Sequence, residues 1–190
     1  MILPIVAYGD PVLKKVGKEI DKDYPGLATL LDNMWQTMYN SEGVGLAAPQ
    51  IGKSIRLFLV DASPFADEDN PETKDLVDFK RVFINPTIIE ESGTEWNFEE
   101  GCLSIPDVRE DVSRHPDVTL EYFDENWNKH KETFSGIAAR VIQHEYDHIE
   151  GILFTDHLSG LRKRLLKGKL SNISKGKISV SYRMRFPQLK

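Results

Sequence analysis

The segment from His144 to His148, His-Glu-Tyr-Asp-His, constrains the fold of this chain more than any other. Two histidines four residues apart project from one face of an α-helix, so both imidazoles can reach the same cation. Glu145 follows the first histidine and can reach a water bound to that cation without being a ligand. Apolar residues from Ser135 to Gly151 recur at helical spacing. We therefore predict a buried, metal-binding helix at the centre of the molecule.

Two histidines do not complete a catalytic metal site, which needs a third protein ligand and an open position. Zinc proteases often take a downstream glutamate, or a histidine placed three residues after a glycine. Here no Glu follows Glu150. The glycine is present as Gly151, but the residue three positions after it is Phe154 and not a histidine. Asp156 and His157 remain open as downstream ligands. Upstream, Cys102 is the only cysteine; a lone thiol is more often an inert core residue, but its thiolate would complete a Cys-His-His set.

The hydrophobic pattern around this helix predicts an α+β fold. Further helices are expected at residues 25–40 and 161–170, and strands at residues 55–60, 82–89, 118–123, 130–134 and 177–186. The segment from Gly43 to Gly52 contains glycines two apart and a proline, which predicts an ordered turn rather than a regular strand. Residues 63–78 are expected to form an exposed acidic loop. Antiparallel strands would thus pack around the central helix, with a C-terminal strand.

The length of 190 residues, with 40% hydrophobic and 28% charged residues, is typical of one folded domain. We expect a single domain over residues 1–190, with a catalytic body at about 1–158 and a basic helix and strand at 159–190. No apolar run approaches the roughly 20 residues that span a bilayer, and the opening segment is too short for a signal peptide. One cysteine cannot form an internal disulfide. A cytoplasmic location without a membrane partner is therefore expected.

The charge of the chain is unevenly distributed. Residues 157–190 contain ten Lys and Arg and no Asp or Glu, so this tail carries +10 and the rest of the chain −16. A solvated tail is the plain explanation. The functional explanation is that the tail contacts an anionic partner such as ribosomal RNA. DNA is not expected as a partner.

Three motifs occur in order along the chain: Gly-Val-Gly-Leu-Ala-Ala-Pro-Gln at 43–50, Glu-Gly-Cys-Leu-Ser at 100–104 and Gln-His-Glu-Tyr-Asp-His at 143–148. They resemble the three signature motifs of the bacterial-type, iron-dependent peptide deformylases, and the likeness covers about residues 4–158. The resemblance implies a metal-dependent hydrolase that removes the N-formyl group from the N-terminal methionine of newly synthesised proteins. Some relatives end in a long helix that docks on the ribosome, whereas here a short basic helix is followed by a predicted strand.

The resemblance also implies a role for each residue of the site. Cys102, His144 and His148 would bind one divalent metal, Fe2+ natively, with Zn2+, Ni2+ or Co2+ as substitutes. Glu145 would be the general base and later the acid. The Gln50 side-chain amide and the Leu103 backbone N–H would donate to the formyl oxygen. Substrate contacts are expected from Val44, Gly45, Glu100, Gly101, Arg109 and Val141.

The methionine side chain of the substrate is expected to lie in an apolar pocket beside the metal. Candidates for its wall, each equally plausible as plain core, are Val44, Leu46, Ile105 and Val141. Gly45 would let the substrate backbone pair along the glycine segment as an extended strand. Arg140 precedes His144 by four residues, where many relatives have an apolar residue. We expect a solvated arginine at the pocket rim, with pairing to Glu100 or to an acidic group of the substrate as alternatives.

Three other functions compete with this interpretation. A metallopeptidase would use the same helix but would need a downstream third ligand. A non-catalytic module for metal or RNA would explain the basic tail but would leave Glu145 and Gln50 without a purpose. A deformylase-like enzyme acting on another formylated amine is the third.

Overall fold

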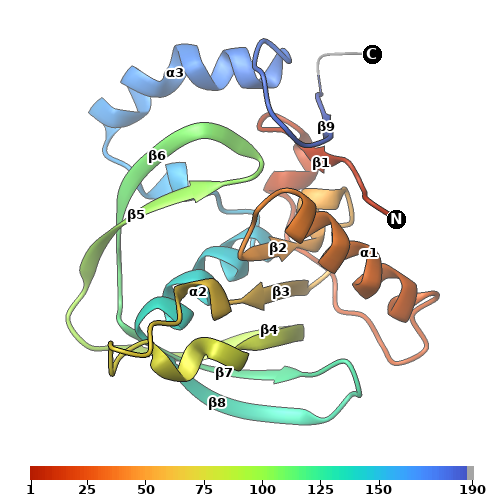
Figure 1. The fold of residues 1–190 in the computed structure, drawn as a ribbon. Coiled ribbons are helices and arrows are strands. Elements are labelled where there is room, and N and C mark those ends of the chain that lie inside the picture. Colours follow the sequence, from red (N-terminus) through yellow and green to blue (C-terminus); the bar gives the residue numbers. More distant parts are fainter. Residues whose placement is uncertain (188–190) are drawn as a thin grey trace.

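The computed structural model describes residues 1–187, in which a central helix lies between two antiparallel β-structures (Figure 1). The helix is α2 (Gly136–Ile149). On one side lies a five-stranded antiparallel sheet with the strand order β2-β3-β4-β7-β8, and on the other lies the long β5–β6 hairpin. This arrangement confirms the predicted α+β fold with antiparallel strands around the motif-bearing helix.

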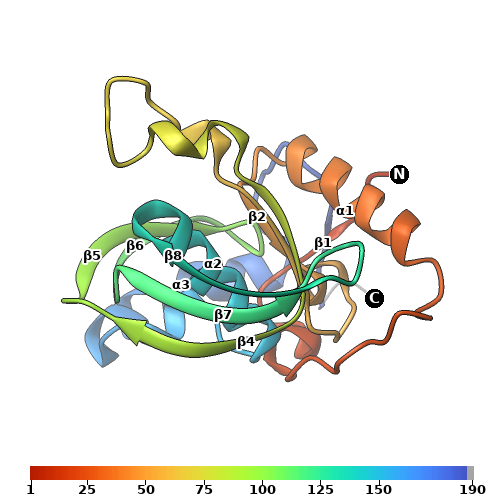
Figure 2. The same cartoon turned by 90° about the horizontal axis from the view of Figure 1, so that it is seen from below.

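The five-stranded sheet consists of β2 (Gly45–Ala47), β3 (Leu57–Asp61), β4 (Lys80–Ser92), β7 (Asp117–Phe123) and β8 (Lys129–Ser135). Its strand β3 is buried along its whole length because helices cover both faces. Phe58 and Val60 belong to the cluster around α2, whereas Leu57 and Leu59 belong to the cluster around α1 (Leu27–Asn40). The period-2 alternation of the strand thus joins both layers of the core. Figure 2 shows α1 and α2 on opposite sides of the sheet.

The hairpin of β5 (Trp96–Cys102) and β6 (Ile105–Arg114) was not predicted from the sequence. Strand β6 buries alternate residues, as expected for a strand with one face on the core. The two strands meet at a tight turn, where the register shifts between Gly101 and Cys102. This turn brings the Glu-Gly-Cys-Leu-Ser motif against α2.

Helix α2 begins after Ser135, as predicted, and its C-terminal end is followed by Gly151. Gly151 has a φ of 73°, a left-handed conformation that suits glycine. The helix buries polar as well as apolar side chains, among them Arg140, His144 and Glu145. Buried polar groups need partners, so this helix requires a polar environment inside the core.

The C-terminal part contains α3 (Gly160–Ser174) and β9 (Met184–Arg185), which pairs in parallel with β1 (Ile5–Val6). The predicted strand at 177–186 is therefore too long, because β1 offers an edge of only two residues. Residues 188–190, the end of the predicted basic tail, lie outside the described residues. Within residues 1–187, no helix combines the length and apolar character needed to cross a bilayer.

Short 3-10 helices connect these elements at Pro11–Lys14 (η1), Ala48–Ile51 (η2), Ser63–Phe65 (η3), Lys74–Asp78 (η4) and Phe154–His157 (η5). The predicted turn at 43–52 is partly wrong, since its residues Gly45–Ala47 form the edge strand β2 and are followed by η2. The acidic segment at 63–78 contains η3 and η4.

Candidate metal centre and substrate groove

Cys102, His144 and His148 come together from two different elements. Cys102 ends β5, and the two histidines project from one face of α2. One donor atom of each residue lies within 4.8 Å of the other two, and Cys102 Sγ is 3.3 Å from His148 Nε2. The two downstream alternatives are engaged elsewhere. Asp156 pairs with Lys14, and His157 Nε2 is 2.7 Å from Asp147 Oδ2.

The residues of this cluster fit a single divalent metal. A thiolate and two imidazoles form a donor set that suits Zn2+, Fe2+ and related ions. Beside the cluster, Oε2 of Glu145 is buried and has no hydrogen-bond partner within residues 1–187. A buried carboxylate oxygen without a partner marks a place for a polar ligand such as a water. Three protein ligands and a nearby free carboxylate are the arrangement expected of a catalytic site rather than a structural one.

The charge states of the cluster favour metal binding. Burial alone would raise the pKa of the Cys102 thiol, but His148 and His144 outweigh it and lower this pKa to about 5. The thiolate, which is the form that binds metals, therefore predominates at neutral pH. Burial raises the pKa of Glu145 to about 7. A carboxylate with such a pKa can take up and release a proton near neutrality.

Glu100 orients His144. Its carboxylate accepts two hydrogen bonds from Arg114, at 2.7 and 3.0 Å, and its Oε2 lies 2.9 Å from His144 Nδ1. Although burial disfavours the charged form, His144 and Arg114 hold the pKa of Glu100 well below its usual range. The partner at Nδ1 leaves Nε2 of His144 available for a metal, as in other sites where a carboxylate supports a histidine ligand.

Arg140 is buried, with only 2% of its surface exposed. The preferred expectation of a solvated arginine at the rim is therefore wrong, and the alternative of pairing with Glu100 is confirmed at 3.2 Å. Two carbonyl groups, of Val112 and Trp96, accept further hydrogen bonds at 2.9 and 2.6 Å. The guanidinium carbon lies 4.5 Å from the centre of the Trp96 ring. The hairpin that supplies these partners was missed in the sequence, so the burial could not be anticipated.

Gln50 and Leu103 both neighbour Cys102, Gln50 through its side-chain amide and Leu103 as the next residue in the chain. The Ala47 N–H donates to Gln50 Oε1 at 2.9 Å, which turns Gln50 Nε2 toward Cys102 Sγ at 3.4 Å. Leu103 occupies the turn between β5 and β6, and its carbonyl accepts a hydrogen bond of 2.7 Å from the Tyr182 hydroxyl. Tyr182 is a contribution of the C-terminal segment that no sequence signal indicated.

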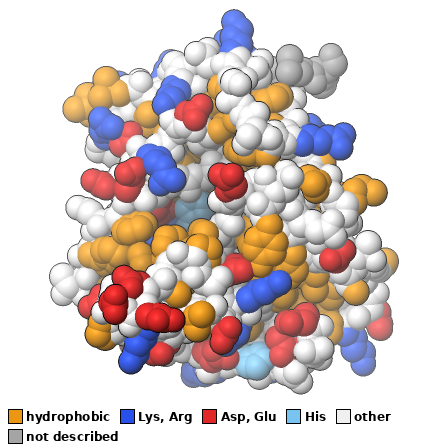
Figure 3. Space-filling model, in the orientation of Figure 1, with side chains coloured by type: hydrophobic (Ala, Val, Ile, Leu, Met, Phe, Trp, Pro, Cys, Tyr) orange, Lys and Arg blue, Asp and Glu red, His pale blue; other side chains and the backbone are white. Residues whose placement is uncertain are grey.

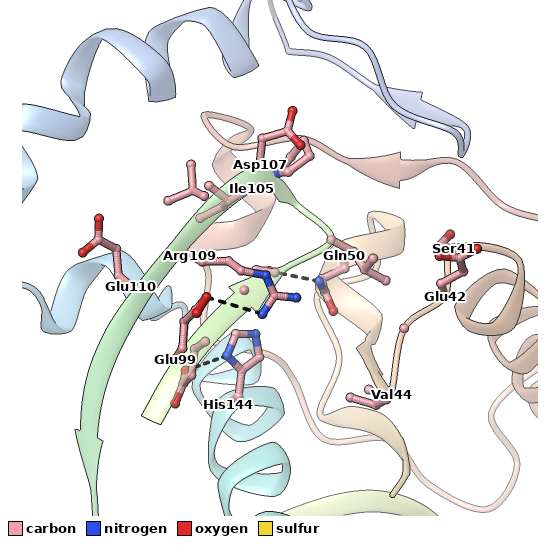
Figure 4. Close-up of a pocket in the computed structure, with 18 of the residues that line it drawn as sticks. Ser41, Glu42, Val44, Gln50, Glu99, Ile105, Asp107, Arg109, Glu110 and His144 are labelled. Carbon is pink, nitrogen blue, oxygen red and sulfur yellow. Dashed lines mark hydrogen bonds and ion pairs between the residues drawn. The ribbon is translucent and has the colours of Figure 1, made fainter. Parts of the chain in front are cut away.

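A groove of about 1140 Å³ opens over the cluster. Figure 3 shows a hollow near the middle of this face, with a histidine side chain at its floor. In Figure 4, Gln50 and Arg109 point toward the space above His144. All the predicted substrate-contact residues line the groove: Val44, Gly45, Glu100, Gly101, Arg109 and Val141. Leu46, by contrast, is fully buried in the core. The lining also includes Phe65, Phe98 and Tyr182, which the sequence analysis missed.

One side of the groove is an open strand edge. Strand β2 is the last strand of its sheet, so no strand of the described part of the chain lies beside its other edge. Gly45, on this strand, lies directly against the side chain of Glu145. An extended peptide can pair with such an edge.

These features define a class of protein. A Cys-His-His cluster on a buried helix, with a carboxylate beside it and a peptide-sized groove above it, is the site of a metal-dependent hydrolase with one catalytic metal and a peptide-like substrate.

Comparison with known proteins identifies the family. The sequence pattern of polypeptide deformylase matches residues 2–164. The peptide deformylase of Christiangramia forsetii is 69% identical (100% of this chain, 98% of that protein), and that of Flavobacterium johnsoniae is 61% identical with the same coverage. The crystal structure of peptide deformylase from Thermus thermophilus superposes with a TM-score of 0.80 at 36% identity (93% of this chain, 99% of that chain). That from Legionella pneumophila gives 0.79 at 37% identity (93% and 98%).

The chain therefore belongs to the polypeptide deformylase family, hydrolases that remove the N-formyl group from the N-terminal methionine of newly synthesised proteins. This finding confirms the resemblance and the predicted activity. It also decides against the metallopeptidase and the non-catalytic module.

Proposed function

We propose that Cys102, His144 and His148 hold the catalytic metal and that Glu145 moves the protons of the deformylase reaction. The observation that carries this proposal is the convergence of three ligand atoms within 4.8 Å beside a buried carboxylate oxygen to which none of the described residues donates a hydrogen bond. A divalent metal, when bound, supplies the Lewis acidity that makes water a nucleophile near neutral pH.

Glu145 Oε2 takes a proton from the attacking water, whose oxygen forms a bond to the formyl carbon. The bond between the formyl carbon and the methionine nitrogen then breaks, and Glu145 returns the proton to that nitrogen. The products are formate and a free N-terminal amine. Gly45 lies directly against the Glu145 side chain and limits its movement on that side, which helps to keep the carboxylate in position for these transfers.

Gln50 Nε2 and the Leu103 N–H donate to the formyl oxygen as negative charge develops on it. The hydrogen bond from the Ala47 N–H to Gln50 Oε1 supports this role, since it directs the amide nitrogen toward the site. Loss of one such donor typically costs about 3 to 4 kcal/mol of transition-state stabilisation.

The substrate backbone extends along the open edge of β2, where Gly45 permits close approach. Val44 and Val141 contribute apolar walls to the groove for the methionine side chain, and Glu100 and Gly101 line it beside the metal ligands. Arg109 is exposed on β6, with its guanidinium 4.0 Å from Glu99, and is free to contact the peptide backbone.

Fe2+ is the proposed native metal, with Zn2+, Ni2+ and Co2+ as substitutes. The thiolate ligand supports this choice, because a Cys-His-His set accepts iron as well as zinc. A ferrous centre beside a thiolate is sensitive to oxygen through the metal and through oxidation of Cys102. We expect iron-loaded protein to lose activity in air; full activity after prolonged aeration would count against iron.

The basic tail is the proposed contact with ribosomal RNA. Helix α3 lies on the outside of the molecule (Figure 1) and is anchored through Arg162, which pairs with Glu110 on β6. Its other basic side chains are exposed. Contact between Tyr182 and Leu103 supports one domain in which the tail contributes to the groove. A cytoplasmic location, without DNA or membrane partners, follows from a substrate that is a nascent protein.

The proposal is tested by formate release from formyl-Met-Ala-Ser, with protein loaded anaerobically with Fe2+. Cys102→Ala should lose both metal and turnover, whereas Glu145→Ala should retain the metal and lose turnover. Metal content, measured on the same samples, separates the two roles. Robust turnover by Glu145→Ala would contradict the assignment of the proton-transfer group.

A further inference from the structure

The C-terminal tail forms the outer end of the groove. Helix α3 contributes Leu166 and Lys169 to the lining, and the loop after this helix contributes residues 179–182. Figure 4 shows the loop, in the blue of the C-terminal end, above the groove. The groove of about 1140 Å³ is larger than the roughly 300 to 1,000 Å³ of a site for a small molecule. It therefore has room for residues of a peptide beyond the methionine.

Two hydrogen bonds hold this tail against the β5–β6 hairpin. The Tyr182 hydroxyl donates to the Leu103 carbonyl at 2.7 Å, in the turn between the strands. Lys169 donates to the Asp107 carbonyl, near the start of β6. Because both anchors lie beside the groove, the loop between them is kept at its outer end. A peptide that binds there meets a segment that is already in place, so less conformational entropy is lost on binding.

The backbone of the loop is open to a ligand. Residues 178–182 make no backbone hydrogen bond with any other part of the described chain, although Lys177 and Arg183 on either side do. Ser179 and Ser181 are exposed, and their hydroxyl groups can both donate and accept. Every peptide backbone carries one donor and one acceptor per residue, apart from the missing donor of proline. Groups of this kind can bind a peptide whatever its side chains.

We propose that residues 179–182 form a binding subsite for the third and later residues of the nascent chain, which they hold by its backbone. This inference rests on the proposed function, in which the formylated methionine lies at the metal centre and the chain extends along β2. The proteins on which a deformylase acts differ in sequence after the methionine. Backbone contacts fit such a substrate better than a pocket for one particular side chain.

A charge-exchange experiment tests whether the nascent chain passes this loop. Ser181→Lys places a cation on the loop, and the substrates are formyl-Met-Ala-Ala-Ala-Ala amides with Glu or Lys at the third, fourth or fifth position. At one or more of these positions, the ratio of kcat/KM for the Glu peptide to that for the Lys peptide should exceed the wild-type ratio by about threefold to tenfold. The excess should shrink as the salt concentration rises, because the charges are exposed to solvent.

Ser92→Lys is the matched control. Ser92 is exposed at the end of β4 and does not line the groove, so this variant adds the same charge elsewhere and should keep the wild-type ratio. Calorimetric dissociation constants of the deformylated pentapeptides provide a second ratio that does not depend on turnover. Ser179→Lys, also exposed on the loop, replaces Ser181→Lys if that variant fails to fold.

A wild-type ratio in the loop variant at all three positions overturns the proposal. So does an equal change in Ser92→Lys, which would reveal a long-range effect of charge rather than passage of the peptide along the loop. Failure of wild type to release formate from these peptides would instead contradict the proposed function, and the ratio of dissociation constants would still decide whether the loop binds the chain.

Discussion

Replacement of Gly45 by alanine should abolish most activity while the fold and the metal cluster persist. A Cβ at this position would lie 2.7 Å from Glu145 Cδ and 2.8 Å from Glu145 Cγ, whereas ordinary contact begins at 3.4 Å. The Glu145 carboxylate would thus withdraw by about 0.7 Å or more. The side chain should yield rather than the backbone, because it is the flexible partner of this contact.

The expected loss follows from that displacement. Moving a catalytic group by about 1 Å costs on the order of 100-fold in rate, which corresponds to about 2.7 kcal/mol of transition-state free energy. Overpacking by one methyl group typically destabilises a core by about 1 to 3 kcal/mol. The loss of stability in Gly45→Ala should lie at the lower end of that range, since the Glu145 side chain can move aside. Activity should therefore fall far more than stability.

The assay is formate release from formyl-Met-Ala-Ser, with metal content and urea unfolding measured on the same preparation. Gly168→Ala serves as the control, because a Cβ at position 168 would have no atom of residues 1–187 within 4 Å other than its own helix backbone and chain neighbours. A Gly45→Ala variant with wild-type kcat would show that catalysis does not depend on this position of Glu145. A variant that lost its metal or its cooperative unfolding would show that the added methyl group disrupts more than Glu145.

Three further changes test other parts of the structure. Glu100→Gln should weaken metal affinity about 10- to 100-fold in chelator competition, because His144 loses its carboxylate partner; wild-type affinity would contradict that role. Tyr182→Phe should lower kcat about fivefold with little change in KM, since the Leu103 turn loses one hydrogen bond of about 1 kcal/mol. A change in KM alone would contradict a role of Tyr182 in positioning the Leu103 turn. Gly168→Ala should raise the free energy of unfolding by about 1 kcal/mol in urea denaturation, because alanine favours the helix interior. A loss of stability would show that the added methyl group at position 168 clashes with a neighbour.

The sequence was sufficient for those parts of the site whose information is local. The spacing of His144 and His148 specifies one helical face, and Ser135 and Gly151 mark the ends of the helix. Cys102 stood out as the only thiol in the chain. The short motifs around these residues then identified the family.

Features that depend on contacts between distant segments could not be predicted. The hairpin of β5 and β6 escaped notice because its strands are rich in acidic residues, and their pairing with each other decides their conformation. The burial of Arg140 depends on that hairpin, since Trp96 and Glu100 provide its partners. Phe65 and Tyr182 reach the groove from the acidic segment and the tail, and neither has a local pattern that indicates this position.

The contact between Tyr182 and Leu103 affects when the enzyme becomes active during its own synthesis and folding. Ribosomes add residues from the N-terminus, and domains fold as their parts emerge. Cys102 and both histidines are therefore synthesised before Tyr182. Strand β1 can pair only after β9 has been synthesised, near the end of the described chain. Such long-range pairing is slow to form. A newly made copy should thus assemble its metal ligands first and gain full catalytic power last, so a protein that processes other nascent chains matures late in its own synthesis.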